Sequence, residues 1–153
     1  MTKYLWMHIA LAGVNMILSA ISATIEIVLL VLLDNFKHED SNPVQFSKLY
    51  NNFFILCLIL DIGAAIVSAL SLYPWILVAY LPLILIKGMK LVAQTWRTNP
   101  TVIRMRNIRE KKEKATVYRI AFYCIMFVVW IVVFIFSVMA RYKLAEKDLR
   151  RYN

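Results

Sequence analysis

The sequence predicts an all-α integral membrane protein with four transmembrane helices and short amphipathic cytosolic segments. Hydrophobic residues make up 61% of its 153 residues, which is more than the polar shell of a small water-soluble domain allows. These residues are gathered into long apolar runs, and about 20 helical residues cross a hydrocarbon core of about 30 Å. Because lipid offers no partners to backbone N–H and C=O groups, each run is expected to be helical.

The first apolar run covers residues 5–33 and follows a single lysine. No small-residue cleavage pattern interrupts this run, so it is expected to stay in the protein as a signal anchor. It is longer than one crossing requires, which predicts a tilted or projecting helix. Its polar residues recur at helical spacing within one narrow arc that is expected to face protein rather than lipid: His8, Asn15, Ser19, Ser22 and Glu26.

The second apolar stretch, residues 53–86, is too long for a single crossing at about 1.5 Å per residue. Within it, Pro74 disfavours a continuous helix, and the aromatic residues on either side of Pro74 prefer the headgroup level. A tight hairpin is therefore expected, with a second span at 53–72 and a third at 74–93. Each has one polar face, formed by Cys57, Asp61, Ala65 and Ser68 in the second span and by Tyr80, Lys87, Lys90 and Gln94 in the third.

The fourth span, residues 120–140, contains no acidic or basic residue. Segment 94–119 carries more lysine and arginine than the tail 141–153 does, and the more cationic side of a membrane protein usually faces the cytosol. This charge distribution predicts that segments 34–52 and 94–119 are cytosolic and that both termini are lumenal.

Apart from Lys90, which is expected to reach water at the end of the third span, three charged residues fall inside the predicted spans: Glu26, Asp61 and Lys87. In the expected topology all three lie in the cytosolic half of the membrane, where an unpaired charge costs several kcal/mol. They are therefore predicted to meet as a cluster of ion pairs that shares a proton or simply fixes the packing of the helices. Of these two roles, packing is favoured over a proton relay.

The cytosolic segments are expected to contain short amphipathic helices. Asn42 is a suitable N-cap, and Pro43 suits the first helical position, so a short interfacial helix is predicted to lead into the second span. A second helix is expected to start at residues 98–100, with an apolar side and a cationic side. It would bind anionic lipids of the cytosolic leaflet, although a basic loop can equally be a topology signal alone.

The chain offers little for catalysis. It contains two cysteines and two histidines, with no His-Glu-x-x-His motif and no glycine-rich phosphate loop. No catalytic residue, metal site or cofactor is therefore expected. The carboxylates of Glu26 and Asp61 leave a small intramembrane transporter or enzyme as a less favoured reading. The basic charge lies beside apolar spans rather than in a nucleic-acid-binding fold, so nucleic acid is not an expected partner.

Three motifs together resemble the cornichon family. They are Asn42-Pro43 after an acidic stretch, Tyr80-Leu81-Pro82-Leu83 in the third span and Ala121-Phe122-Tyr123 at the start of the fourth. The resemblance implies a single membrane domain over residues 1–153, with four spans and both termini lumenal. It also implies a receptor that collects membrane-protein cargo in the endoplasmic reticulum for vesicles of the COPII coat and cycles to the early Golgi. Some animal members remain with glutamate-receptor channels as auxiliary subunits.

In fungal members of this family, a cytosolic motif of the Ile-Phe-Arg-Thr-Leu type engages the coat. The matching stretch of this chain is Thr101, Val102, Ile103, Arg104, Met105 and Arg106. Arg104 stands where the family motif has an aromatic residue, so the sequence does not decide whether coat binding is retained.

The preferred function is therefore a cargo receptor whose partners are transmembrane cargo proteins and COPII coat subunits. Small residues of the first two spans would pack against a cargo helix: Ala12, Gly13, Ala64 and Ala69. The same residues can instead pack within the bundle. An auxiliary subunit of a channel or transporter at the cell surface is the main alternative. The identity of the cargo and the formation of a homo-oligomer are left open.

Overall fold

The computed structural model describes residues 2–37, 42–71, 74–101 and 105–152 of the chain. All its elements are helical, and they follow one another as α1 (Thr2–Lys37), α2 (Pro43–Ala69), the 3₁₀ turn η1 (Pro74–Ile76), α3 (Leu77–Val92) and α4 (Arg106–Tyr152).

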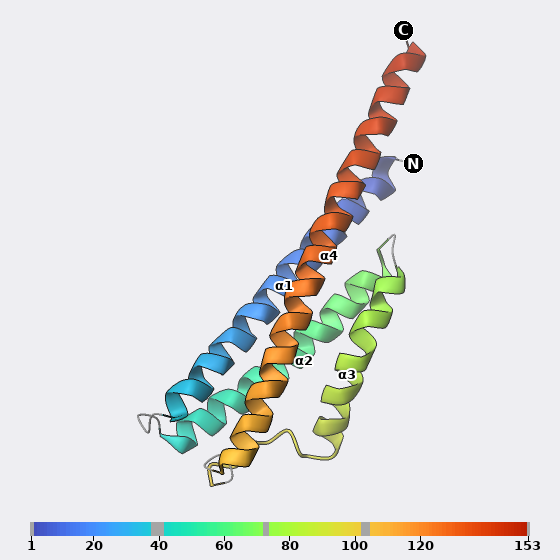
Figure 1. Ribbon diagram of the computed structural model, residues 1–153. Coiled ribbons are helices and arrows are strands. Elements are labelled where there is room, and N and C mark those ends of the chain that lie inside the picture. The colour runs from blue at the N-terminus through green and yellow to red at the C-terminus, as the bar shows by residue number, and fades with distance from the viewer. Residues whose placement is uncertain (1, 38–41, 72–73, 102–104, 153) are drawn as a thin grey trace.

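The helices form an antiparallel bundle (Figure 1). α4 lies along α1, α2 packs on α1, and α3 folds back on α2 through the region that contains η1. Both termini lie at one end of the bundle, and the connections that follow α1 and α3 lie at the other. The two segments predicted to be cytosolic therefore share one end of the molecule.

Among the described residues, three helices are long and apolar enough to cross a membrane, over Trp6–Phe36, Pro43–Ala69 and Arg106–Ala145. α3 contains 16 residues, which corresponds to about 24 Å of helix, and is shorter than an ordinary span. It starts only after a 3₁₀ turn and ends at Val92; Ala93 is its C-cap, and Gln94, the next residue, adopts a left-handed φ of 53°. Such a residue is a common way to terminate a helix.

Two helix starts differ from those expected from the sequence. Asn42 caps α2 as predicted, since its side chain accepts a hydrogen bond from the Val44 N–H at 3.0 Å. However, α2 runs from Pro43 to Ala69 without a break, so there is no separate interfacial helix before the second span. α4 begins at Arg106 rather than at residues 98–100, which lie in an irregular stretch with a turn.

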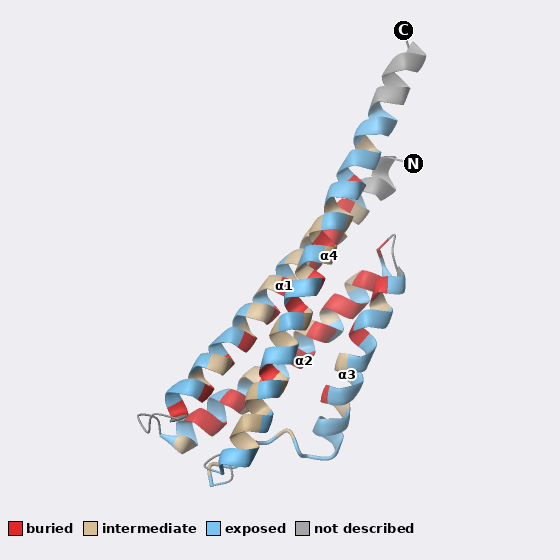
Figure 2. Cartoon of the chain, viewed as in Figure 1, coloured by how far each residue is buried: buried red, intermediate tan, exposed pale blue. Residues whose placement is uncertain are grey.

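The apolar core is divided into two clusters. One lies toward the termini and contains Ala12, Ala64, Ala65, Ile76, Tyr80, Met126 and Trp130. The other lies where α1 meets the start of α2 and contains Leu29, Leu33, Phe36, Phe46 and Tyr50. The buried positions follow the facing sides of the helices (Figure 2), and large apolar side chains cover much of the outer surface. This is the pattern of a bundle whose solvent is lipid.

Candidate functional site

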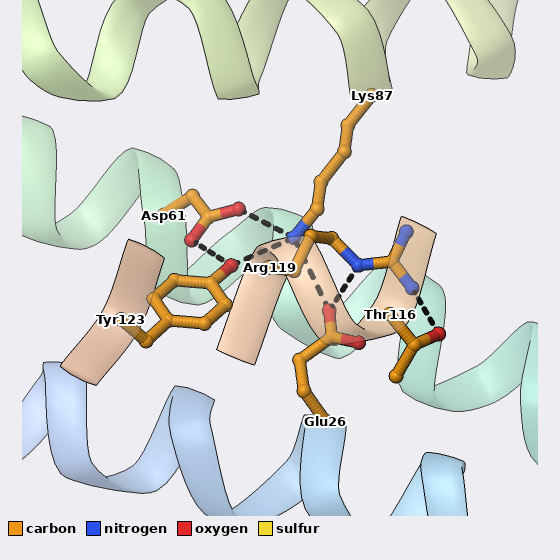
Figure 3. A network of polar contacts seen from close by, with 6 residues as sticks. All are labelled: Glu26, Asp61, Lys87, Thr116, Arg119 and Tyr123. Carbon is orange, nitrogen blue, oxygen red and sulfur yellow. Dashed lines mark hydrogen bonds and ion pairs between the residues drawn. The ribbon is translucent and has the colours of Figure 1, made fainter. Parts of the chain in front are cut away.

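Each of the four helices contributes one charged side chain to a single network inside the bundle (Figure 3). We call these residues the charged cluster: Glu26 of α1, Asp61 of α2, Lys87 of α3 and Arg119 of α4. The side chains of the first three are no more than 3% exposed, and that of Arg119 is 12% exposed. A site built from all four helices forms only when the complete bundle is assembled.

One half of the charged cluster is a closed triangle of hydrogen bonds. Lys87 Nζ donates to Asp61 Oδ2 at 2.6 Å and to the Tyr123 hydroxyl at 2.9 Å. The Tyr123 hydroxyl in turn donates to Asp61 Oδ1 at 2.7 Å. Both oxygens of the Asp61 carboxylate are therefore occupied by donors, which offsets much of the cost of burying this charge.

The other half of the charged cluster is the ion pair between Glu26 and Arg119. Arg119 Nε lies 2.7 Å from Glu26 Oε1, and its Nη2 donates to Thr116 Oγ1 at 3.0 Å. Lys87 Nζ is 4.0 Å from the same Glu26 oxygen, so it links the two halves.

Two acids and two bases make up the charged cluster, so its formal charges cancel. Each carboxylate has a cation within 4.0 Å. Buried pairs of this kind add little net stability but are costly to break, because removing one partner strands the other in an apolar interior. The charged cluster cross-links the four helices, which is the arrangement that a packing role requires.

Neutral hydrogen bonds continue this polar interior toward the termini. Trp130 Nε1 donates to the Tyr80 hydroxyl at 3.1 Å, and Ser19 Oγ lies 3.3 Å from the same oxygen. Asn15 Nδ2 donates to Ser68 Oγ at 3.2 Å. The polar arc of the first span therefore faces the other helices, as its spacing indicated.

Sequence reasoning missed two members of this site, Arg119 and Tyr123. In the sequence, Arg119 is one of many basic residues in segment 94–119 and is therefore interpreted as a determinant of topology. A signal is nevertheless present, because the buried residues of α4 lie on one helical face, at spacings of seven, three, four and seven positions: Thr116, Tyr123, Met126, Trp130 and Ser137. Arg119 falls on that face.

The structure corrects the expectation that the small residues considered for a cargo interface face outward. Ala12 and Ala64 are 1% and 3% exposed and belong to the apolar cluster near the termini. Gly13 is half-buried, with Phe134 of α4 3.8 Å from the position of a Cβ atom. These residues let the helices of this chain approach closely. Only Ala69 is exposed.

The stretch matched to the coat motif lies beside the connection between α3 and α4. Val102, Ile103 and Arg104 lie outside the described residues, whereas Thr101, Met105 and Arg106 are exposed. The last of these pairs with Glu110 at 2.7 Å. No group of three potential metal ligands lies close together in the described part of the chain.

The comparisons with known proteins identify the family. A model described as "Cornichon protein" matches residues 8–140. Neither the curated proteins nor the solved structures contain a significant match. The matched region takes in the four residues of the charged cluster and most of the chain, and the protein therefore belongs to the cornichon family.

Proposed function

We propose that this protein is a cargo receptor that binds transmembrane proteins in the endoplasmic reticulum and promotes their export in COPII-coated vesicles. Membership of the cornichon family supports a cargo-receptor or auxiliary role in general, in a family that works by binding rather than by catalysis. The finer assignment to export rests on the resemblance to the family's cargo receptors.

The proposed topology has four crossings, with both termini in the lumen. Its support is the common end of the two termini and the antiparallel return of α3 along α2 (Figure 1). In this topology the short α3 completes the third crossing together with η1, and the bilayer thins locally around it. Burial of Lys87 at 2% exposure is consistent with a helix held within the bundle.

The observation that carries the proposal is the separation of inner and outer surfaces. Most polar side chains in the middle of α1 and α2 are buried against the other helices, among them Asn15, Ser19 and Asp61, while the outer faces carry exposed branched aliphatic residues. Helices in lipid associate through close packing of such surfaces. We place the cargo-binding surface on the outer faces of α1 and α2, which include Ile17, Ile21, Ile55, Ile59 and Ile66.

The coat would bind at the end of the bundle that lies away from the two termini. Segments 34–52 and 94–119 lie there, and they include the exposed side chains of Thr101, Met105 and Arg106. We propose that these segments link the cargo complex to coat subunits, and that their basic residues also contact anionic lipids.

The test is the surface proteome of cells from which this protein has been deleted. We expect a subset of membrane proteins to be lost from the surface and retained in the endoplasmic reticulum, and the wild-type chain to restore them. Ile59→Trp together with Ile66→Trp, which alter the outer face of α2, should fail to restore them. Val78→Trp with Leu85→Trp makes the same change on the exposed face of α3 and should restore them.

An unchanged surface proteome would contradict the cargo-receptor function. The auxiliary-subunit alternative makes a different prediction for the protein itself. A tagged cargo receptor resides in the early secretory pathway at steady state, whereas an auxiliary subunit accompanies its channel to the plasma membrane.

A further inference from the structure

α3 and α4 are separated along the side of the bundle. In the described part of the chain, no Cα atom of α3 comes within 8 Å of a Cα atom of α4. Long side chains bridge the gap instead, among them Lys87 to Tyr123 and Trp130 to Tyr80. Between these two helices lie two adjoining cavities with opposite chemical character.

The first cavity is apolar and has a volume of about 430 Å³. Its apolar lining includes Ala79, Pro82, Leu83, Ile86 and Phe122, and its charged lining residues are Lys87, Lys90 and Arg119. This volume falls in the range of about 300–1,000 Å³ that is typical of sites for small organic ligands. The chemistry of the walls suits a hydrocarbon chain.

The second cavity is cationic and has a volume of about 200 Å³. Lys90, Lys111, Lys112 and Arg119 line it, and no acidic residue is among the described residues of its wall. Lys90, Ala115 and Arg119 line both cavities. The two are therefore neighbours, and the cationic one lies nearer the connection between α3 and α4.

The wall of the cationic cavity is held in place by the residues that follow α3. Trp96, which lines it, stacks on Phe54 of α2 with ring centroids 5.9 Å apart. The backbone N–H of Thr98 donates to Asn51 Oδ1 at 2.8 Å, and Lys112 Nζ donates to Thr98 Oγ1 at 2.7 Å. The cavity is thus built by three helices and their connection, with Lys112 fixed in its wall and Lys90 and Lys111 exposed.

The charges beside the two cavities do not cancel. Lys87 and Arg119 are neutralised by Asp61 and Glu26 within the charged cluster. This leaves the positive charges of Lys90, Lys111 and Lys112 at the cationic cavity, next to a cavity that suits hydrocarbon. A ligand that matches both has an anionic group joined to an apolar chain.

We propose that the gap between α3 and α4 binds one anionic phospholipid. Its headgroup would occupy the cationic cavity and one acyl chain the apolar cavity, in the leaflet on the side of the α3–α4 connection. Membrane lipid surrounds the gap, so such a ligand enters laterally without crossing water. The site is independent of which cargo or coat the protein binds.

Native mass spectrometry of the purified chain released from lipid nanodiscs tests this site. The nanodiscs contain phosphatidylcholine alone or with phosphatidylserine, and the readout is the fraction of protein that retains one phosphatidylserine. Lys90→Gln with Lys111→Gln removes two exposed cations of the cavity and should weaken retention about 30-fold, at about fivefold for each lysine. Leu83→Trp, which fills the apolar cavity, should also lower retention.

The matched control is Lys48→Gln with Lys114→Gln. It removes the same charge from exposed positions at the same end of the bundle but touches neither cavity, and it should retain phosphatidylserine as the wild type does. Equal losses in both double variants would reveal only general attraction to the membrane surface and overturn the proposal. Retention unaffected by Leu83→Trp, or equally strong binding of water-soluble glycerophosphoserine, would overturn it as well. Unchanged thermal unfolding of each variant establishes that a loss of lipid is not a loss of fold.

Discussion

Arg119 Nε lies 2.7 Å from Glu26 Oε1, so the last helix of the chain is tied to the first by an almost completely buried ion pair. Lys87 joins this pair to Asp61, at 4.0 Å from Glu26 and 2.6 Å from Asp61. The charged cluster thus connects helices that are far apart in sequence, and the first three predictions concern its energetics.

Replacing Asp61 with asparagine should destabilise the bundle strongly. The Asp61→Asn change would leave the Lys87 ammonium without its nearest counter-charge, and breaking a buried pair in this way costs about 3–5 kcal/mol. The measurement is the thermal unfolding midpoint of the detergent-purified protein, together with its expression level. Asp61→Leu combined with Lys87→Leu removes both charges and should recover much of the loss.

This comparison also separates the two roles considered for the cluster. A structural role predicts low expression of the Asp61→Asn variant and partial recovery in the double variant. If the single variant instead folded normally and lost only cellular function, a proton relay would be the better explanation.

Glu26 and Arg119 should show strong thermodynamic coupling. Glu26→Gln and Arg119→Gln each strand one charge, whereas the double variant strands neither. The coupling energy from a double-mutant cycle of unfolding free energies should therefore reach about 1–3 kcal/mol. Additive effects would mean that the two side chains do not interact in the membrane. Arg106 and Glu110 form an exposed pair and provide a comparison, for which the coupling should stay at or below about 0.5 kcal/mol.

Removing the Tyr123 hydroxyl should cost about 1–3 kcal/mol. The Tyr123→Phe change preserves the ring but removes a donor to Asp61 and an acceptor for Lys87, which leaves a buried charged group underpaired. Tyr118→Phe makes the same chemical change on α4 at a side chain that is 75% exposed, and its effect should lie within about 0.5 kcal/mol. Equal unfolding midpoints for the two variants would contradict the hydrogen-bonded triangle.

Cysteine labelling in sealed microsomes should establish the four crossings. Asn107→Cys is expected to react with a membrane-impermeant maleimide added outside, because the α3–α4 connection is cytosolic in the proposed topology. Leu70→Cys and Ala145→Cys should react only after detergent is added. The unsubstituted protein is the control for the two native cysteines, of which Cys57 is buried and Cys124 is exposed on the apolar part of α4.

Each position reports on a different part of the topology. Labelling of Leu70→Cys without detergent would show that the hairpin between α2 and α3 stays on the cytosolic side, so that neither helix crosses. If Asn107→Cys reacted only after detergent was added, the bundle would have the opposite orientation in the membrane.

Much of the fold follows from features that are local in the sequence. Long apolar runs indicate helices because lipid leaves the backbone no other partners, and the hairpin near Pro74 follows from a stretch too long to cross once. The short extent of α3 is not predictable in this way. The expected third span, 74–93, ends close to where α3 ends, but its first turn, Pro74–Ile76, is a 3₁₀ helix, and this leaves 16 residues for α3.

The site is only partly predictable, for two physical reasons. A count of charges treats every arginine near a span as a topology signal. It therefore assigns Arg119 to the cytosolic segment and does not pair it with Glu26, which lies near the other end of the chain. Small residues suit a cargo interface and an internal helix contact equally well. Whether Ala12 and Ala64 belong to a cargo interface or to an internal helix contact can therefore be decided only from the positions of the neighbouring helices.

Because each helix contributes one residue to the charged cluster, the four charges enter the membrane at different times during synthesis. Glu26 enters the membrane with the first helix to leave the ribosome, long before the codons for Lys87 and Arg119 are translated. During that interval its carboxyl group must be either protonated or sheltered by the insertion machinery, because lipid cannot solvate the anion. Lys87 and Arg119, the cations nearest to Glu26, become available only when α3 and α4 have been made.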